Sequence, residues 1–491
     1  MTDLDLETLT RSLSRDDAEQ YADVALSSGL AEYLPSPTGT YLTGTYPPLK
    51  AMQPVEAAAV FADVTDELNV YVHIPFCRQK CTFCHFAKEI KPGQDRVAAY
   101  LQALVAEMRQ AASVLGARRR ARSVYFGGGT PSTLTAAEMR MLFAALHDNF
   151  VIDAATEFTF ELHPQIVRDP DLARDKLAAM REAGVNRIAF GVQSLDDGVL
   201  KILNRGHDGQ QVFDLLQLLR DEGMTNVSVD LMYGLPDETL ASWSQTLTRL
   251  LDAGVSKFNI FPLFFKITDP ISRLYERHPE RFPDARQRLA AHVHAEALLS
   301  AKGFHRGPVL YYSRAEHHSQ QQELKFDAID DVNLLGLGVS AFGYLGSTQY
   351  YNLCDIDSYI AAVEDGQMPV WRGTTLDDDE LSRRAVMFGL RSAGVDRQAF
   401  QTRFGQLPEH RFPVLHELRD RGLLELAAGV WTTTAIGAYC VDTISSLFAS
   451  QAVLTRVEQT NRELPDRRHS PIEQYDFSPL GRDQFSIPGA R

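Results

Sequence analysis

Three of the five cysteines in this 491-residue sequence lie close together, at positions 77, 81 and 84. Thiolates are the usual ligands of iron–sulfur clusters, and three of them can bind three irons of a [4Fe–4S] cluster. A short loop after the apolar stretch Val70 to Phe76 brings Cys77, Cys81 and Cys84 onto one side of such a cluster. The fourth iron then has no protein ligand and is open to a small molecule.

A structural zinc site is the alternative for the same three cysteines. Zinc in a closed tetrahedral site requires a fourth ligand, commonly Cys or His. His85 directly follows Cys84, and His73 lies in the preceding apolar stretch, so both are candidates for that ligand. The sequence favours the cluster over zinc.

Composition excludes several classes of protein. Hydrophobic residues make up 44% and charged residues 23% of the chain, which is typical of a globular protein of two or three domains. The formal net charge of −15 disfavours a nucleic-acid partner. There is no apolar run of about 18 residues and no signal sequence, so we expect a cytoplasmic protein without a membrane segment. Cys354 and Cys440 stand alone, as in a reducing compartment.

The cysteines open a region in which short β-rich runs alternate with helical patterns. This alternation predicts an α/β fold with a parallel sheet over residues 69–305. Residues 1–68 are expected to form an N-terminal arm, 306–375 a linking segment that completes the active site, 376–460 a mainly helical cap and 461–491 a loosely ordered tail. The predicted strands are NVYVHIPF, SVYFGG, EFTFEL, RIAFGV, VSVDLMYG and KFNIFPLF.

The helix after the cysteines shows the expected period. Val97, Leu101, Leu104 and Met108 form one apolar stripe, and Glu107 lies off it. The next helix is predicted to start at Pro170 and to end before Gly184. In such αβ units, functional residues lie at the carboxyl ends of the strands.

Polar and glycine residues follow these strand ends. The second strand leads into GGGTP, at Gly127 to Pro131, where backbone amides can approach a ligand closely. Further along the chain, strand ends or the loops after them carry Glu161, Gln193, Arg205 and Asp230. Buried salt bridges are the alternative explanation for these charged residues.

Together these motifs resemble a known family. CxxxCxxC with an aromatic residue before the last Cys is similar to the signature of radical S-adenosylmethionine (SAM) enzymes. VHIPFC, FGGGTPS, FGVQS, LNRGHD and VDLMYGLP, in this order, resemble the oxygen-independent coproporphyrinogen III oxidase family over residues 69–440. The resemblance implies a partial (β/α)6 barrel, a [4Fe–4S] cluster on Cys77, Cys81 and Cys84, and SAM bound to the open iron.

The resemblance also implies ligands for SAM. Glu161 and Asp230 would contact its ribose and ammonium, and Arg205 its carboxylate. The remaining contacts implied for the cluster-bound SAM are Tyr71, Gly128 and Gln193. Members of this family often bind a second SAM, for which Gly129, Thr130 and Phe342 match, and more loosely the Phe261 to Phe265 run, with Phe264 the candidate in it.

Departures from the oxidase suggest one branch of the family. Phe86 stands where the oxidase has a fourth cysteine, and residues 320–326 lack its Phe-Gln pair. These absences count against the oxidase, and the N-terminal TGTYPPLKAM segment together with CTFCHF looks more similar to class C radical SAM methyltransferases, including enzymes that form cyclopropanes in natural products. Two SAM molecules and a methylene radical that adds to an sp2 carbon are then expected. A haem-pathway enzyme such as coproporphyrinogen III dehydrogenase and a non-catalytic haem chaperone are the alternatives.

The expected partners follow from that branch. They are an aromatic or unsaturated natural-product substrate, a reductant such as flavodoxin or ferredoxin, and a partner methyltransferase-like enzyme. Candidates for proton transfer are His85, Glu89, Lys266, Tyr311 and Tyr312, with His317 and His318 as a weaker pair.

The C-terminal part is predicted to be helical with one hairpin. Residues 376–440 read as helices followed by a hairpin that turns at Gly429, and one further helix is expected at 443–458. A winged-helix DNA reader is the alternative, but the stretch begins with Asp377 to Glu380 and is not strongly basic. A cap that shields radical intermediates from water fits better.

Overall fold

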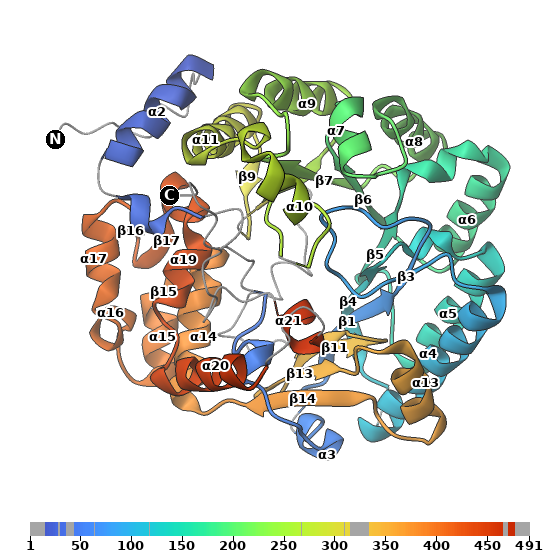
Figure 1. The fold of residues 1–491 in the computed structure, drawn as a ribbon. Helices are drawn as coiled ribbons and strands as arrows, with labels where there is room; N and C mark the ends of the chain where they lie inside the picture. Colours follow the sequence, from blue (N-terminus) through green and yellow to red (C-terminus); the bar gives the residue numbers. More distant parts are fainter. Residues whose placement is uncertain are drawn as a thin grey trace.

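The protein is described here by a computed structural model. It describes residues 15–27, 30–35, 44–62, 64–116, 118–266, 268–308, 310–314, 333–464 and 470–476. Figure 1 shows a ring of strands surrounded by helices, with the C-terminal helices grouped on one side. Among the described residues, none of the helices combines the length and the apolar character needed to cross a bilayer.

Six parallel strands form the centre of the ring and follow one another in chain order. They are β1 (Glu67–Ile74), β4 (Arg120–Gly128), β5 (Glu157–Leu162), β6 (Arg187–Gln193), β7 (Val227–Tyr233) and β8 (Lys257–Pro262). Most of their side chains are buried, as expected when helices cover a parallel sheet. Across β4 and β5, for example, Phe126 is paired in register with Phe160. The predicted six-stranded α/β core is confirmed.

Helices cover the outer face of these strands (Figure 1). They are α4 (Gln94–Val114), α5 (Ala136–Asn149), α6 (Pro170–Glu182), α8 (Gly209–Asp221), α9 (Leu240–Asp252) and α11 (Ala285–Ala301). Local sequence fixes where they start. Thr135 and Glu138 form a capping box at α5, and Asp169 caps α6 by accepting a hydrogen bond from the amide of Leu172. The predicted start of α6 at Pro170 is confirmed.

Glu107 on α4 differs from its prediction. The apolar stripe of α4 is buried as expected, but Glu107 is also fully buried. Its carboxylate accepts hydrogen bonds from the Gly338 amide at 2.7 Å, the Asn352 side chain at 2.8 Å and the Tyr359 hydroxyl at 2.5 Å. Glu107 therefore joins α4 to strands far along the chain, which the helical period could not reveal.

The sheet extends beyond the six central strands at both ends. Next to β1 lie β11 (Asn333–Leu337), β12 (Phe342–Leu345), β13 (Thr348–Asn352) and β14 (Val370–Thr375). Next to β8 lie β10 (Tyr311–Ser313) and β9 (His305–Arg306). Within the described residues the sheet thus has twelve strands, and its two edges, β14 and β9, are not paired with each other.

The C-terminal module combines short helices with a small sheet. Its helices are α14 (Asp378–Arg391), α15 (Arg397–Phe404), α16 (Pro408–Arg411), α17 (Val414–Asp420), α18 (Ala435–Tyr439), α19 (Val441–Ser446) and α20 (Gln451–Glu463). Its strands are β15 (Val395–Asp396), β16 (Leu424–Ala427) and β17 (Val430–Thr433), and the hairpin turns at Gly429 with φ +84°. One prediction is wrong. Instead of a single helix at 443–458, α19 ends at Ser446 and Ser450 caps a separate α20.

Segments from both ends of the chain pack on this framework. Near the N-terminus, α2 (Arg15–Ser27) contacts α11, where Arg286 pairs with Glu19 and Asp23. The short helices η2 (Leu49–Ala51) and α21 (Pro471–Tyr475) pack together in a cluster that includes Leu49, Met52, Ile472 and Tyr475. In Figure 1, α21 lies near the middle of the ring.

Candidate active site

The cysteine loop is closed at its base and tied to the barrel. Strands β2 (Phe76–Cys77) and β3 (Glu89–Ile90) pair in parallel and hold the two ends of the loop together. The Gln79 side chain donates to the Asn204 carbonyl at 2.7 Å, and the Asn204 side chain donates to the Lys80 carbonyl at 2.8 Å. Thr82 hydrogen-bonds to the Leu203 and Ile202 carbonyls. These contacts fix the loop over the strand ends.

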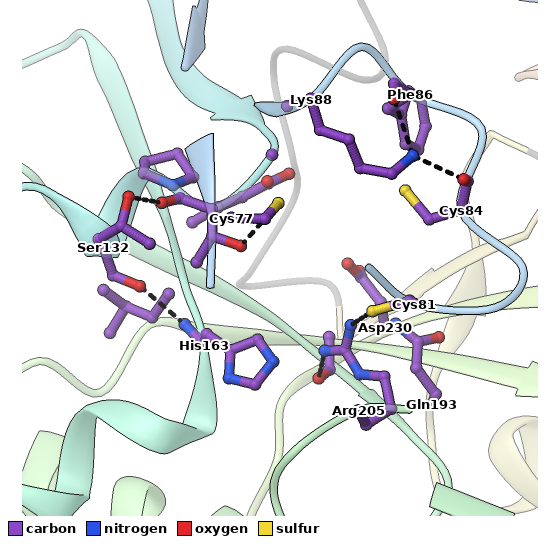
Figure 2. A pocket seen from close by; sticks show the side chains of 18 of the residues that line it. Cys77, Cys81, Cys84, Phe86, Lys88, Ser132, His163, Gln193, Arg205 and Asp230 are labelled. Carbon is purple, nitrogen blue, oxygen red and sulfur yellow. Dashed lines mark hydrogen bonds between the residues drawn. The ribbon is translucent and has the colours of Figure 1, made fainter. Parts of the chain in front are cut away.

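The three cysteines line one cavity (Figure 2). The Thr130 hydroxyl lies 3.5 Å from the Cys77 sulfur, and the Arg205 guanidinium donates to the Cys81 sulfur at 3.3 Å. Burial raises the pKa of Cys77 to about 11 and also raises the pKa of Cys84. An electropositive metal that replaces these protons would stabilise the thiolates. The donor set therefore fits an iron–sulfur cluster.

The two histidines considered as zinc ligands are engaged elsewhere. His73 hydrogen-bonds with the Tyr71 hydroxyl at 3.0 Å and with the Ala87 carbonyl at 3.1 Å. His85 hydrogen-bonds with Asp269 at 3.4 Å and stacks on Phe264. Among the described residues, no three His, Cys, Asp or Glu side chains are arranged as ligands of one metal ion. With both histidines in other contacts, the described residues offer the three cysteines no fourth ligand of the kind that a closed zinc site requires.

Two partly buried carboxylates line the cavity, Glu161 near the end of β5 and Asp230 in the middle of β7. Tyr125 donates to Glu161 at 2.5 Å, and Asn259 donates to Asp230 at 2.6 Å. Burial, together with the negative charge of Asp230, raises the pKa of Glu161 to about 7. Burial likewise raises the pKa of Asp230. A cationic ligand such as an ammonium or sulfonium group would stabilise the charged form of both.

Gln193 and Arg205 complete this polar wall. The register between β6 and β7 shifts between Gly191 and Gln193, and Gln193 has φ +68°. A left-handed φ is costly for a residue with a side chain, and such strain concentrates at functional sites. Arg205 donates to the Gly191 carbonyl at 2.7 Å, which aims its guanidinium at the cysteine loop. Figure 2 shows Gln193, Arg205 and Asp230 next to Cys81.

The glycines after β4 are needed for close packing of the backbone, and they also line the cavity. A side chain at Gly128, where φ is +112°, would collide with the His73 ring at 2.5 Å. A side chain at Gly129 would lie 2.9 Å from the Ile74 carbonyl. Both glycines also line the cavity. The missing side chains therefore let the loop after β4 approach the end of β1 closely, in addition to exposing backbone to a ligand.

Aromatic side chains also line the cavity. Among them are Phe83, Phe261, Phe264, Tyr311, Phe342 and Tyr351. Phe342 stacks on Tyr71 with ring centroids 6.4 Å apart, and Phe342 also contacts Tyr351. The cavity has a volume of about 440 Å³, within the range of small-molecule sites. Its lining thus combines polar and charged groups with aromatic faces suited to a flat apolar ligand.

Most of the predicted site residues are brought together by the fold. The cavity is lined by Tyr71, Cys77, Cys81, Cys84, His85, Gly128, Gly129, Thr130, Glu161, Gln193, Arg205, Asp230, Phe264, Tyr311 and Phe342. Phe86, which stands in place of a fourth cysteine, also lines it and is 50% exposed. His317, His318 and residues 320–326 lie outside the described residues.

Three proton-transfer candidates do not line the cavity. Glu89 forms an ion pair with Arg96 on α4. The buried Lys266 ammonium donates to the Asp476 carbonyl at 2.7 Å. Tyr312 donates to Glu296 on α11, because alternate residues of a strand face opposite sides of the sheet and Tyr311 is the one that faces the cavity.

Several lining residues were missed from the sequence. Tyr125 and Asn259 hold the two carboxylates, and Arg78, Arg168 and Lys176 place positive charge in the wall. A signal existed for some of them: Arg78 follows a cysteine ligand, and Asn259 lies within a predicted strand. Lys176 gave no signal, because its helix has ordinary amphipathic character.

Comparisons with known proteins agree with this geometry. Residues 71–250 match the Radical SAM superfamily, and residues 376–439 match the HemN C-terminal domain. The oxygen-independent coproporphyrinogen III oxidase of Bradyrhizobium diazoefficiens is 30% identical over 383 residues, covering 74% of this chain and 82% of that protein. The heme chaperone HemW of Bacillus subtilis is 28% identical over 361 residues, covering 72% of this chain and 92% of that protein.

A solved structure supports the same assignment. The structure titled as coproporphyrinogen III oxidase (HemN) from Escherichia coli, a radical SAM enzyme, superposes with a TM-score of 0.67 at 26% identity. The alignment covers 79% of this chain and 92% of that one. The predicted partial barrel with a helical C-terminal domain is therefore confirmed.

These relatives overturn one expectation from the sequence. They are named for coproporphyrinogen oxidation and for haem delivery. The prediction of a class C methyltransferase or cyclopropane-forming enzyme with a natural-product substrate is contradicted by this finding. The similarity extends over most of the chain, and the departures at Phe86 and at residues 320–326 do not outweigh it.

Proposed function

Because the chain belongs to the oxygen-independent coproporphyrinogen III oxidase family, we propose that it is a radical SAM enzyme that oxidises a porphyrinogen-type tetrapyrrole. The observation that carries this proposal is a single cavity whose lining combines two kinds of group. It bears the three cysteines and polar side chains such as Glu161 and Asp230, and it also bears aromatic rings such as Phe264 and Phe342. Such a cavity suits a charged cofactor beside a flat macrocycle with an apolar surface.

The chain's own residues would hold the cofactors on the polar wall. Bound there, a [4Fe–4S] cluster supplies the electron that cleaves SAM into methionine and a hydrogen-abstracting radical. Cys77, Cys81 and Cys84 would bind the cluster. Glu161 and Asp230 are suited to the cationic part of SAM, and Arg205 to its carboxylate.

A second SAM is part of the proposal. Gly129, Thr130 and Phe342 line the same cavity as the cysteines. Thr130 has its hydroxyl near Cys77, and Phe342 offers an aromatic face for stacking. These three residues are candidates for a second SAM beside the first. A flavodoxin or ferredoxin is the proposed reductant.

The test uses anaerobically reconstituted protein with dithionite, SAM and coproporphyrinogen III. We expect 5'-deoxyadenosine to form together with a decarboxylated tetrapyrrole, and neither to form with Cys81→Ala. Release of 5'-deoxyadenosine with unchanged coproporphyrinogen III would contradict the proposed substrate. Two bound SAM molecules per chain, counted by calorimetry, would support the second site.

Haem delivery is the second candidate function, favoured by one observation. Phe86 stands where the oxidase has a cysteine, and it lies half-exposed at the edge of the cavity. A carrier would bind haem and produce little 5'-deoxyadenosine under the same conditions. The reconstitution experiment therefore distinguishes the two functions in one assay.

A further inference from the structure

One part of the cavity wall carries positive charge that the cofactors do not account for. Arg78 extends from the cysteine loop, Arg168 ends η4 (Pro164–Arg168) and Lys176 lies on α6, and all three line the cavity. The chain as a whole has a net charge of −15. A local group of cations in an acidic protein is a feature that binding of an anion would explain.

The two arginines have no carboxylate partner. Arg78 is exposed, and the described residues offer it no hydrogen bond or ion pair. Arg168 is also exposed and donates only to the Gly206 carbonyl, at 2.5 Å. Other exposed arginines of the barrel, such as Arg140 and Arg174, are paired with Asp or Glu, whereas Arg78 and Arg168 are not. The guanidinium groups of Arg78 and Arg168 are therefore available to a ligand.

The pKa values of Lys176 and His163 indicate that these positive charges lie close together. The buried Lys176 ammonium donates to the Ser132 carbonyl at 2.7 Å. Burial, and then the charge of Arg78, lowers the pKa of Lys176 to about 8. Burial also lowers the pKa of His163 well below its usual value, with further contributions from Arg205, Arg78 and Arg168. His163 and Ser132 lie together beside the cysteine loop in Figure 2.

Acidic side chains offset only part of this positive charge. The charges of Glu138, Asp169 and Asp175 counter part of the effect of burial on the pKa of Lys176. The acidic residues among those that line the cavity are Glu161, Asp230 and Asp169, and the first two belong to the polar wall already described. The Asp169 carboxylate accepts a hydrogen bond from the Leu172 amide at 3.1 Å at the start of α6.

We propose that Arg78 and Arg168, with Lys176 nearby, form a subsite for the carboxylate groups of the substrate. Arginine is suited to this task because its planar fork can bind a carboxylate through two hydrogen bonds. Leu172, which is 40% exposed, and Ile166 line the same part of the cavity and offer apolar contact beside the charges. The subsite thus fits an apolar framework that carries acidic arms. Its assignment to the propionate arms of a porphyrinogen rests on the proposed function.

The test measures tetrapyrrole affinity in the reconstituted protein, by fluorescence titration with coproporphyrin III and with its tetramethyl ester. We expect the Arg78→Gln, Arg168→Gln double variant to bind coproporphyrin III at least tenfold more weakly and the ester with unchanged affinity. Arg168→Gln alone should show a smaller loss, and Arg168→Lys should restore part of it. Arg456→Gln, at an exposed arginine on α20 outside the cavity, serves as the matched control.

Iron content and SAM affinity are measured on every variant. Unchanged iron in Arg168→Gln keeps the test valid even if Arg78, next to Cys77, disturbs the cluster. The proposed subsite is overturned if the double variant loses affinity for coproporphyrin III and for its ester equally, or loses affinity for neither. A variant that binds SAM more weakly but binds coproporphyrin III normally also overturns it. So does a variant whose only defect is slower reduction by flavodoxin.

The outcomes also separate this inference from the proposed function. If wild-type protein oxidises coproporphyrinogen III and the variants bind it normally, the subsite is wrong and the function stands. If wild-type protein binds no tetrapyrrole, the same variants are titrated with citrate as a free polycarboxylate. Weaker citrate binding in the double variant then supports the subsite without the proposed substrate, and equal citrate binding overturns it.

Discussion

Glu107 and Glu161 lie in two different regions of the barrel, and burial raises the pKa of each to about 7. The carboxylate of Glu107 receives hydrogen bonds from Gly338, Asn352 and Tyr359, and it does not line the cavity. The carboxylate of Glu161 is held by Tyr125 and lines the cavity. A perturbed pKa is thus common to both regions. The two carboxylates differ in their surroundings. Glu107 is surrounded by protein donors and has a structural role, whereas Glu161 faces a cavity and can bind a ligand.

The strongest test of the comparison is in the cavity region. Cys81→Ala should abolish iron binding as a [4Fe–4S] cluster and all SAM cleavage, because a cluster with an open iron needs all three thiolates. Iron content and 5'-deoxyadenosine formation measure the two effects. The barrel should keep its far-ultraviolet circular dichroism, since Cys81 is only partly buried. A full cluster in this variant would contradict the assignment of the ligands.

The second test is in the structural region. Glu107→Ala should lower the free energy of unfolding by about 3 to 5 kcal/mol, because three buried donors lose their acceptor. Denaturant unfolding of the cluster-free protein measures it. Glu107→Gln should cost less, since its amide oxygen still accepts. A change below about 1 kcal/mol in the Ala variant would mean that the carboxylate does not hold α4 to β11 and β13.

The third test concerns Glu161 in the cavity, where we expect a loss of activity without a loss of stability. Glu161→Gln should reduce SAM cleavage at least tenfold, because the negative charge that would face a cationic ligand is removed. Its free energy of unfolding should stay within about 1 kcal/mol of the wild type, since an uncharged amide relieves the burial of charge. Equal loss of stability in Glu161→Gln and Glu107→Ala would erase the distinction between the two regions.

The smallest expected effect is a dependence on pH. The pKa of Glu107 is raised from 4.5 to about 7 in the folded protein. Between these two pH values Glu107 binds more protons in the folded state than in the unfolded state. Its contribution to the free energy of unfolding is therefore largest below pH 4.5 and falls as pH rises to about 7. The difference in unfolding free energy between wild type and Glu107→Gln should shrink over this range by about 2 to 3 kcal/mol. A difference that stays constant with pH would show that Glu107 remains ionised throughout.

The sequence predicted the residues that local pattern controls. Parallel strands bring their carboxyl ends to one edge, so Glu161 and Asp230 could be expected to meet once their strands were recognised. The cysteine loop and the start of α6 are likewise predicted by short motifs. These features depend on residues that are close together in the sequence, so the sequence alone is enough to predict them.

The sequence could not predict residues whose role depends on distant partners. Glu107 looked like a surface residue because its three donors, Gly338, Asn352 and Tyr359, lie more than 200 positions away in the chain. Tyr312 and Tyr311 could not be distinguished without the register of β10 on β8. Lys176 and Arg168 gather beside Arg78 only because the β5 and α6 segments fold under the cysteine loop. The substrate branch was also misjudged, since single departures say little about a site built from the whole chain.

The two unpaired sheet edges have a consequence for the size of the barrel. No backbone ladder joins β14 to β9; the C-terminal module lies between them, and Arg306 of β9 donates to the Thr433 carbonyl of β17 at 2.8 Å. A ring completed by side-chain contacts can widen or narrow by sliding that module, without breaking a single hydrogen bond among the parallel strands. The hydrogen bonds of the six central strands therefore do not fix the width of the ring on the side where the C-terminal module lies.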